Sequence, residues 1–358
     1  MKGNGKKSIF IKIFAALLVL MIFFLSKGEN QEKLIELFNM DSLLLDDINV
    51  INSISADDEI DDIACYDGHI MMRKDSKLVR YSREGNKEWE KEFNFTDFYV
   101  TFGDIGIYVS DRNQGDIYYL NSEGDTIGRF KSEGRIKSIK ESGENILIHL
   151  EDDGNESIEI LDTSGKMIAR KMLEDKYILD YCFLNKINRY AVSTLNLENE
   201  GIKSEIQVYS LNGELNWDLK LDDELIMYIS FIDDKGLVAM SSNILYYIDE
   251  GNIVWQKDIS SPKGICVDEK SIYILYGSTF EVISRDGAAK ESLSLKEEYN
   301  KFILANGYAV LYGEENLMGF KGAKKMFKYK AEEPIIKVIE GNGNLIVLYE
   351  NRIDIVTF

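Results

Sequence analysis

The chain has 358 residues, of which 45% are hydrophobic, 11% aromatic and 29% charged, and only 2 are proline. This is the composition of a globular protein and excludes a disordered or collagen-like chain. The 62 acidic residues outnumber the 42 basic ones and give a formal charge of -20, which excludes the basic face typical of a nucleic-acid binder. Three cysteines and 2 histidines exclude a disulfide-stapled scaffold and leave little material for zinc hydrolases or histidine-dependent triads.

An apolar run near the N-terminus predicts a membrane anchor. Residues 9–25 read IFIKIFAALLVLMIFFL, interrupted by one charge at Lys12. Their length lies at the short end of the about 17–25 residues that cross a bilayer. Residues 1–26 hold no acidic residue but four lysines, namely Lys2, Lys6, Lys7 and Lys12. The positive-inside bias therefore makes residues 1–8 a cytoplasmic tail and residues 9–25 a single-pass signal anchor in the lipid bilayer of the cell membrane, with the remaining chain extracytoplasmic.

A cleaved signal peptide is the alternative to this anchor. Signal peptides have shorter apolar regions of about 7–15 residues, followed by small residues, whereas Ser26-Lys27-Gly28 is a poor cleavage site after a longer run. No cysteine follows the run directly, which excludes a lipoprotein anchor. Under either interpretation the bulk of the chain lies outside the cytoplasm.

Residues 26–46 are predicted to form a juxtamembrane stalk. Its apolar residues recur at roughly helical spacing, which favours a helix that docks on the domain or binds a partner: Leu34, Ile35, Leu37, Phe38 and Leu45. Without the four N-terminal lysines, 38 basic residues face 62 acidic ones, so the exported part carries a charge of about -24. The electrostatic field of this negative charge keeps the protein soluble and favours cationic partners.

An internal repeat organises the rest of the chain. Each copy is an alternating strand, a short turn ending in glycine and a second strand, as in LVRYSREGNKEWEKE from Leu78 and IQVYSLNGELNWDLK from Ile206. The seven turn glycines are spaced by 39, 41, 48, 38, 36 and 35 residues: Gly85, Gly124, Gly165, Gly213, Gly251, Gly287 and Gly322. Two further apolar runs precede each hairpin, so each unit is four antiparallel strands that must stack on its neighbours.

All three tryptophans stand at one position of this unit. Trp89, Trp217 and Trp255 each follow a turn glycine by four residues, which predicts a large ring wedged between adjacent sheets. Gly128 and Glu291 occupy this position in two other copies.

The Asp-x-x-Gly-x-x-x-Trp-like hairpins resemble the quinoprotein-like (PQQ-like) β-propeller repeat, over about Asp57 to Phe358. The resemblance implies an all-β propeller in residues 47–358, and its layout is closest to single-pass, membrane-anchored propeller proteins of Gram-positive bacteria. Quinone-dependent dehydrogenases of this kind need a cofactor shelf, a Ca²⁺ site and a catalytic Asp near the axis. None of these can be matched residue by residue in this sequence, so the resemblance implies fold rather than function.

Eight blades are preferred over seven. Three strand-like runs follow the seventh hairpin (335–339, 345–349 and 352–357), and a three-stranded sheet would leave an exposed edge. Asp47–Ile54 (DINVINSI) can supply the missing outer strand, which would join the two ends of the chain. The runner-up is a seven-bladed ring with an appended sheet.

The sequence singles out no catalytic, cofactor-binding or metal-ligating residue. No Gly-x-Ser-x-Gly elbow, Walker loop or His-Glu-x-x-His is present. Cys65, Cys182 and Cys266 fall on the first strands of non-adjacent units, too far apart for a disulfide. The acidic stretches 57–62 and 151–156 look superficially like cation loops, yet the second lacks the regular ligand order of a calcium loop.

These observations favour a non-catalytic interaction platform or sensor in the cell envelope, with a protein partner on one face and no nucleic acid. The period-breaking insertion Leu195–Lys203 is the best candidate docking loop. The alternative is an enzyme or small-ligand binder that uses the central channel, either quinoprotein-type or a lyase. Adding Ca²⁺ and pyrroloquinoline quinone, and following absorbance and melting temperature, distinguishes the two.

Overall fold

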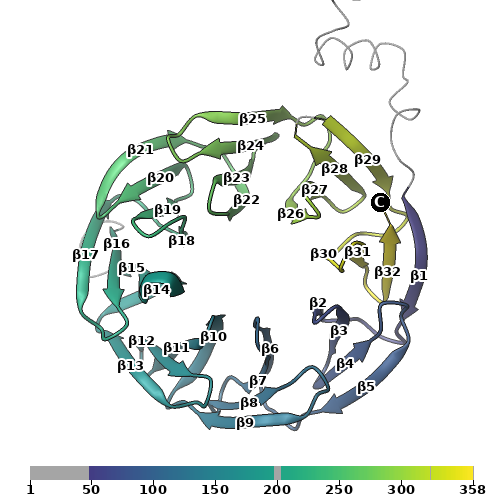
Figure 1. The fold of residues 1–358 in the computed structure, drawn as a ribbon, viewed down its shortest axis with the longest axis horizontal. Helices are drawn as coiled ribbons and strands as arrows, with labels where there is room; N and C mark the ends of the chain where they lie inside the picture. Colours follow the sequence, from purple (N-terminus) through teal and green to yellow (C-terminus); the bar gives the residue numbers. More distant parts are fainter. Residues whose placement is uncertain (1–47, 197–202, 323, 358) are drawn as a thin grey trace, which may run out of the picture.

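The structure is a computed structural model that describes residues 48–196, 203–322 and 324–357. Their strands form eight four-stranded antiparallel sheets arranged as blades around a ring (Figure 1). The predicted cytoplasmic tail, anchor and stalk (1–8, 9–25 and 26–46) lie outside the described residues. Within the part that is described, no helix is long and apolar enough to span a bilayer.

Blades 1–4 follow one another in the chain, and each blade runs from its inner to its outer strand. Blade 1 contains β2 (Asp62–Tyr66), β3 (His69–Lys74), β4 (Lys77–Tyr81) and β5 (Lys87–Glu92). Blade 2 contains β6 (Phe98–Phe102), β7 (Ile107–Asp111), β8 (Asp116–Leu120) and β9 (Thr126–Lys131). Blade 3 contains β10 (Arg135–Ser142), β11 (Asn145–Asp152), β12 (Asn155–Asp162) and β13 (Met167–Leu173). Blade 4 contains β14 (Lys176–Leu184), the 3-10 turn Asn185–Ile187, β15 (Arg189–Asn196), β16 (Lys203–Ser210) and β17 (Leu215–Asp222).

The remaining four blades complete the ring. Blade 5 contains β18 (Tyr228–Phe231), β19 (Gly236–Met240), β20 (Ile244–Asp249) and β21 (Asn252–Asp258). Blade 6 contains β22 (Pro262–Val267), β23 (Ser271–Tyr276), β24 (Thr279–Ser284) and β25 (Ala289–Ser294). Blade 7 contains β26 (Lys301–Ala305), β27 (Tyr308–Tyr312), β28 (Asn316–Lys321) and β29 (Lys324–Lys330). Blade 8 contains β30 (Lys337–Glu340), β31 (Leu345–Leu348), β32 (Arg352–Thr357) and β1 (Asn49–Ser55).

The predicted closure of the ring is confirmed. β1 pairs antiparallel with β32 from Asn49↔Thr357 to Ser55↔Arg352, and Figure 1 shows the purple strand β1 beside the yellow strand β32. The first strand of the fold thus serves as the outer strand of the last blade. The seven-bladed alternative is wrong, because β1 completes β30–β32 as an eighth four-stranded blade.

The core lies between the blades, because each sheet buries its faces against both neighbours. Eight clusters of buried apolar residues fill the eight interfaces, one cluster to each interface. Second strands such as β7 and β19 are buried along their whole length. Outer strands such as β21 instead alternate between partly buried and exposed residues, as expected for a sheet edge that faces solvent on one side.

The ring has two faces that differ in the connections they carry. Connections between first and second strands, and between third and fourth strands, lie on one face, which we call the turn face. Connections between second and third strands, and those that lead from one blade to the next, lie on the other, which we call the crossover face. The start of β1 and the end of β32 lie together on the turn face.

Candidate functional site

Five of the seven hairpins on the turn face share one local geometry, namely those at Gly85, Gly124, Gly165, Gly213 and Gly287. In the first, Gly85 N donates to Ser82 O (2.9 Å) and Ser82 N donates to Asn86 O (2.8 Å), and Gly85 has a φ of +82°. This is a tight turn whose last residue must adopt the left-handed conformation, which glycine does without strain. The Ser82 hydroxyl also accepts bonds from the N–H groups of Glu84 and Asn86, and the Asn121 and Asp162 side chains accept bonds from turn N–H groups in the next two hairpins.

A β-bulge follows at the same point of every hairpin, and it selects which residue faces the next blade. The register shifts directly beside Trp89, Trp217 and Trp255. The same position is held by Gly128, Ala169 and Glu291 in three other hairpins, and by Phe327, five residues after Gly322, in the seventh.

Each tryptophan ring lies against the turn glycine of the following blade. A Cβ on Gly124 would stand 3.1 Å from the Trp89 ring, and one on Gly287 would stand 3.1 Å from the Trp255 ring; Trp217 lies in the same way against Gly251, at 3.4 Å. The Trp89 indole donates to Ser122 O at 3.3 Å, and the Trp255 indole donates to Arg285 O at 2.7 Å. All three rings therefore join neighbouring blades by packing, and Trp89 and Trp255 also do so by a hydrogen bond.

The other interfaces fill this position differently. Phe130 covers Gly165, and the β1 residues Asn52 and Ile54 cover Gly85. Nothing described lies within 4 Å of a Cβ placed on Gly213, and Gly322 is approached by the Glu291 carboxylate alone, at 3.5 Å. Among the described residues, no aromatic ring therefore fills this position between blades 3 and 4 or between blades 6 and 7.

Replacing Trp255 by alanine should destabilise the protein by about 2 kcal/mol, less than a fully buried aromatic would because the ring is partly exposed. The variant loses stacking on Tyr247 (centroids 5.7 Å apart, planes at 10°) and the bond to Arg285 O. Urea unfolding measures the effect. Val254→Ala is the matched control, because Val254 is adjacent and 57% exposed; equal losses in both variants would contradict the wedge.

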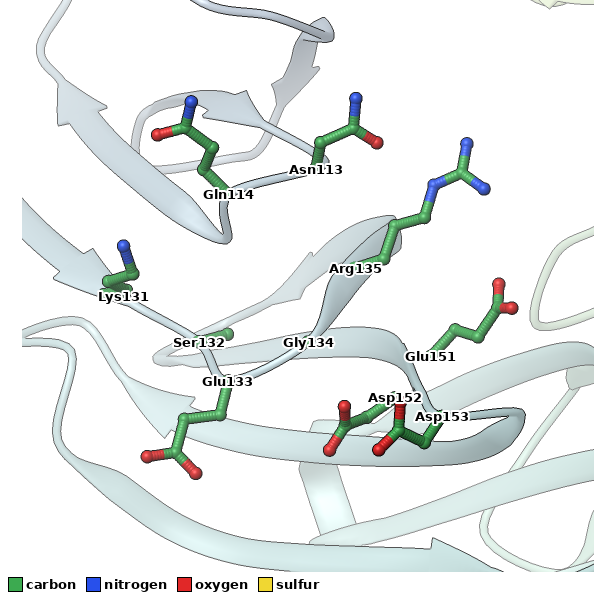
Figure 2. A pocket seen from close by; sticks show the side chains of 10 residues that line it. All are labelled: Asn113, Gln114, Lys131, Ser132, Glu133, Gly134, Arg135, Glu151, Asp152 and Asp153. Carbon is green, nitrogen blue, oxygen red and sulfur yellow. The ribbon is translucent and has the colours of Figure 1, made fainter.

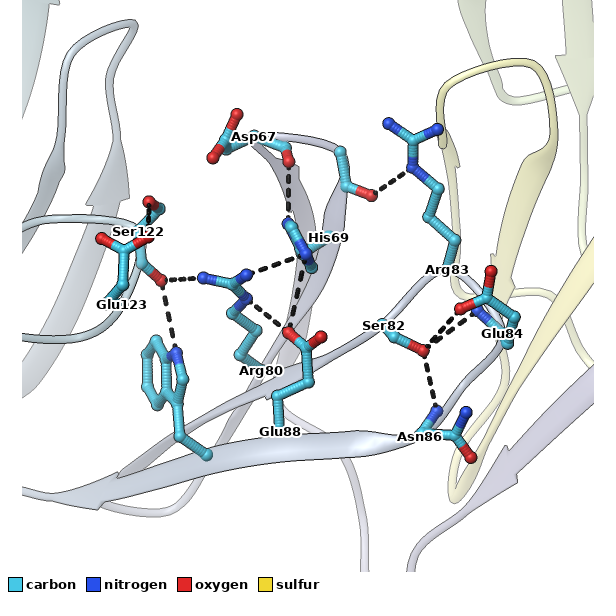
Figure 3. Close-up of polar contacts among 12 residues, drawn as sticks. Asp67, His69, Arg80, Ser82, Arg83, Glu84, Asn86, Glu88, Ser122 and Glu123 are labelled. Carbon is cyan, nitrogen blue, oxygen red and sulfur yellow. Dashed lines mark hydrogen bonds and ion pairs between the residues drawn. The ribbon is translucent and has the colours of Figure 1, made fainter.

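A polar network joins blades 1 and 2 close to Trp89 and uses one of the two histidines (Figure 3). Arg80 Nε donates to Glu88 (2.6 Å), its Nη2 reaches His69 Nε2 (2.8 Å), and Arg80 also donates to Ser122 O across the interface. His69 Nδ1 lies 2.8 Å from Asp67 O. Because Arg80 can only donate, His69 Nε2 accepts and Nδ1–H donates, so both ring nitrogens are occupied in structural bonds.

His149 is also structural. It is 7% exposed, and its Nε2 lies 3.1 Å from the Glu156 carboxylate, which is 6% exposed and accepts a further bond from Ile178 N in the next blade. Glu156 ends the acidic stretch 151–156, and this contact aims its carboxylate into the core. Asp153 and Gly154 have φ values of +47° and +82°, which makes this stretch a two-residue hairpin turn.

Lysines on the inner strands form hydrogen bonds from one blade to the next around the axis. Lys140 on β10 donates to Asp180 (2.8 Å) and Tyr181 O (2.5 Å) on β14, and Asp180 in turn accepts from Ile229 N (2.9 Å) on β18. Lysines of three later blades make equivalent bonds to backbone carbonyls: Lys263 to Tyr299, Lys301 to Ile336 and Lys337 to Ile63. Sequence reasoning missed these lysine contacts, because the partners are 35 to 41 residues apart, or 274 where the ring closes, and no local pattern marks them.

A cavity of about 400 Å³ opens beside the Lys140–Asp180 pair and is lined also by Tyr181, Cys182 and Tyr228. Burial raises the pKa of the Cys182 thiol to about 12 and that of the Tyr228 hydroxyl to about 12. Both groups are therefore protonated at neutral pH, whereas a nucleophilic cysteine needs a lowered pKa. Lys140 and Asp180 pair with one another, so neither the thiol, the phenol nor this ion pair offers an activated nucleophile.

The three cysteines are free thiols on β2, β14 and β22, in blades 1, 4 and 6 as expected from the spacing. Across residues 48–196, 203–322 and 324–357, no group of three or more His, Cys, Asp or Glu side chains is arranged to hold a metal ion. The described residues therefore do not fit the calcium–quinone centre of a quinone-dependent dehydrogenase, and no chemical step is assigned through one.

The crossover face is strongly acidic. Its described connections carry nineteen acidic residues and two basic ones, Arg112 and Lys296; the acidic residues are Asp57, Asp58, Glu59, Asp61, Asp75, Asp97, Glu133, Asp153, Glu174, Asp175, Asp223, Glu224, Glu297, Glu298, Glu314, Glu315, Glu332, Glu333 and Glu350. The turn face is more mixed, because its connections also carry six basic residues: Arg83, Lys166, Lys186, Lys235, Lys270 and Arg285.

A depression of about 580 Å³ lies on the crossover face between blades 2 and 3. Figure 2 shows acidic side chains on both of its sides, with Glu133 on the β9–β10 connection and Asp152 and Asp153 at the β11–β12 turn. Asp97 lies 2.8 Å from Arg112 and 3.9 Å from Arg135, which leaves these guanidinium groups partly neutralised. The lining of the depression consists mostly of charged and polar side chains.

The predicted docking insertion Leu195–Lys203 falls mostly outside the described residues. Its described ends, Leu195 and Asn196 on β15 and Lys203 on β16, belong to the second and third strands of blade 4. The insertion therefore starts and ends on the crossover face.

Known proteins with this architecture were found through their structures. BamB from Moraxella catarrhalis is 12% identical, covers 87% of this chain and 100% of its own, and superposes with a TM-score of 0.61. Sqt1 from Saccharomyces cerevisiae is 10% identical, with coverage of 86% and 98% and a TM-score of 0.65. The C-terminal WD40 domain of Sif2 is 12% identical, with coverage of 88% and 99% and a TM-score of 0.65. At these identities the likeness shows the fold alone.

No curated protein matches the chain in sequence. A family model does match it, that of a family of unknown function, DUF5711, over residues 44–358. Because this match covers every blade of the ring, the chain belongs to the DUF5711 family.

Proposed function

We propose that this protein is a non-catalytic interaction platform of the cell envelope that binds a basic protein partner on its crossover face. The observation that carries the proposal is the uneven charge of the two faces, with nineteen acidic residues against two basic ones on the crossover connections. A field of one sign attracts an oppositely charged partner and speeds its encounter. The hydrogen-bonded histidines and the protonated Cys182 thiol described above support a binding rather than a catalytic role.

Membrane attachment, with the propeller outside the cytoplasm, is part of this proposal. It rests on the apolar run of residues 9–25 and the four lysines before or within it. β1 begins on the turn face, so a chain attached through its N-terminus leaves the crossover face free. Kinship with quinoprotein-like repeats, and with membrane-anchored propellers of Gram-positive layout, is inferred from the Gly-x-x-x-Trp hairpins. The orientation can be tested with a cysteine introduced at exposed Asp125. A membrane-impermeant reagent should label this cysteine on intact cells, and labelling that occurs only after lysis would contradict the proposed orientation.

Site-specific photocrosslinking in the full-length protein tests the platform. A photoreactive residue at exposed Glu314 on the crossover face should capture a basic protein, and one at exposed Asp125 on the turn face should not. Capture should fall several-fold between 50 mM and 500 mM salt, because exposed charges are screened. Glu314→Lys with Glu315→Lys should reduce capture by a partner-bound photoreactive group, whereas Asp125→Lys should leave it unchanged. Equal capture at both positions, or capture insensitive to salt, would contradict the proposal.

A further inference from the structure

The interface between blades 6 and 7 lacks the ring that fills three other interfaces. Glu291 follows Gly287 by four residues and stands beside the β25 bulge, in the position that Trp255 holds on β21. Where the Trp255 ring lies against Gly287, the only approach to Gly322 among the described atoms is the Glu291 carboxylate. A shorter acidic side chain thus replaces the indole that three other hairpins carry at this position.

A cavity of about 440 Å³ results at this interface, on the turn face. Its apolar floor comes from both blades and includes Phe280, Val282 and Phe320, which belong to the buried cluster between them. Tyr273, Tyr308 and Glu291 also line the cavity. In Figure 1 this interface lies between the sheets that end in β25 and β29.

Other charged groups around the cavity are already engaged. Asp268 accepts from the Tyr273 hydroxyl (2.9 Å) and from the N–H groups of Lys270 and Ser271. The Lys290 ammonium donates to Lys270 O (3.1 Å) and to the Ser271 hydroxyl (2.9 Å). The Glu291 carboxylate forms no hydrogen bond or ion pair with any described residue, so it is the charge that remains available to a ligand.

We propose that this cavity binds a planar aromatic group that carries a cationic nitrogen, such as an aromatic amine. The ring takes the position that an indole occupies between blades 1 and 2, 4 and 5, and 5 and 6, where it packs on the next blade. The cation pairs with Glu291, whose carboxylate lies at the edge of an apolar floor and is less screened there than on an open surface. The Tyr273 ring adds a face that attracts a cation, whereas the Tyr308 ring already lies 5.6 Å from Lys321 Nζ. This site lies on the turn face and is independent of the partner proposed for the crossover face.

Tryptamine is the probe, because it joins an indole to an ammonium group. Titration into the purified full-length protein in detergent, followed by calorimetry, should give saturable binding. Indole-3-acetate, which has the same ring and the opposite charge, should bind at least tenfold more weakly. Equal affinities for the two compounds, or no saturable binding of tryptamine up to millimolar concentration, would overturn the proposal.

Two variants at one residue separate the ring and charge contributions. Glu291→Gln should weaken tryptamine binding at least tenfold and leave the weaker binding of neutral indole unchanged. Glu291→Trp places the repeat's own residue in the cavity and should abolish binding of both compounds, while the melting temperature stays equal or rises. Glu269→Gln, at a turn-face residue outside the cavity lining, is the control and should bind as the unaltered protein does. Undiminished tryptamine binding by a folded Glu291→Trp protein would place the site elsewhere and refute the proposal. If that variant does not fold, undiminished tryptamine binding by Glu291→Gln would refute it.

Discussion

A chain that begins at Ala56 is expected to lose cooperative folding, because it lacks the strand that closes the ring. β1 forms the outer edge of blade 8 and brings Ile54, which is 6% exposed, against Ile353 and Ile355, which are 0% exposed. Without it the β32 backbone becomes a free edge, which pairs readily with other chains. The expected loss exceeds about 5 kcal/mol, because an entire strand and its share of one interface core are removed. Thermal unfolding and size-exclusion chromatography measure the two consequences, a missing transition and aggregation.

The matched control for this truncation is a chain that begins at Ile48. It lacks residues 1–47 but retains β1, so it should remain monomeric and melt in one transition. A milder variant, Ile54→Asp in the full chain, should lower stability by about 3 kcal/mol, because it places a carboxylate in an apolar cluster without a partner. A monomeric, cooperatively melting chain from Ala56 onward would show that the ring does not depend on β1.

The hairpin repeat could be recognised from sequence because its requirements are local. The turn glycines have positive φ values such as +82° at Gly85 and +80° at Gly124, and in five of the hairpins the residue three positions earlier forms backbone hydrogen bonds that close the turn. Alternation over short strands then predicts one buried face per sheet. The closing strand was predictable for a different reason, namely that three strands at the C-terminus left an unmatched edge and an apolar segment preceded the first unit.

The side-chain contacts between neighbouring blades could not be predicted from the sequence in the same way. The substitute for the ring at Gly165 is Phe130, six residues after Gly124 instead of four, because the outer strand can offer its next inward-facing residue. Glu291 appeared in the sequence only as a departure from the repeat, and its consequence depends on what Gly322 and β28 place opposite. The Lys140–Asp180 pair and the charge of the crossover face likewise depend on contacts among residues from different units. These contacts and this charge distribution depend on how the blades are arranged around the ring, so they could be identified only once the fold was known.

Substituting Asp111 by alanine is expected to destabilise the protein by about 3 kcal/mol. Asp111 is 2% exposed at the end of β7, and its carboxylate accepts from Thr96 N (2.7 Å), the Thr96 hydroxyl (3.0 Å), Asn113 N (3.1 Å) and Gln114 N (3.3 Å). Thr96 lies on the connection from blade 1 and Asn113 on the β7–β8 turn, so one side chain holds two loops of the crossover face together. Alanine leaves these donors without their acceptor, and each buried unsatisfied donor costs about 1–3 kcal/mol.

The contribution of Asp111 should also depend on pH. Burial acts to raise its pKa, but the hydrogen bonds from Thr96, Gln114 and Asn113 outweigh burial and hold the pKa below its ordinary value of 3.8. Because the folded-state pKa is the lower one, the stabilisation is complete above the unfolded value and is lost as pH falls through the folded value. The difference in unfolding free energy between the unaltered protein and Asp111→Asn should therefore be constant above about pH 5 and shrink below about pH 4.

Asp116→Asn is the control for both measurements. Asp116 stands on the neighbouring strand β8, its side chain is 38% exposed, and its partner Lys131 lies 3.4 Å away. An exposed pair of this kind contributes less than about 1 kcal/mol, so urea unfolding at pH 7 should separate the two variants clearly. A loss at Asp116 as large as that at Asp111, or an Asp111→Asn difference that grows on acidification, would contradict the assignment of these four hydrogen bonds as the source of stability.

Because the same bonds fix the loops beside the depression lined by Asn113 and Gln114, Asp111→Asn should also loosen that part of the crossover face, which hydrogen exchange of the Gln114 amide would detect as faster exchange.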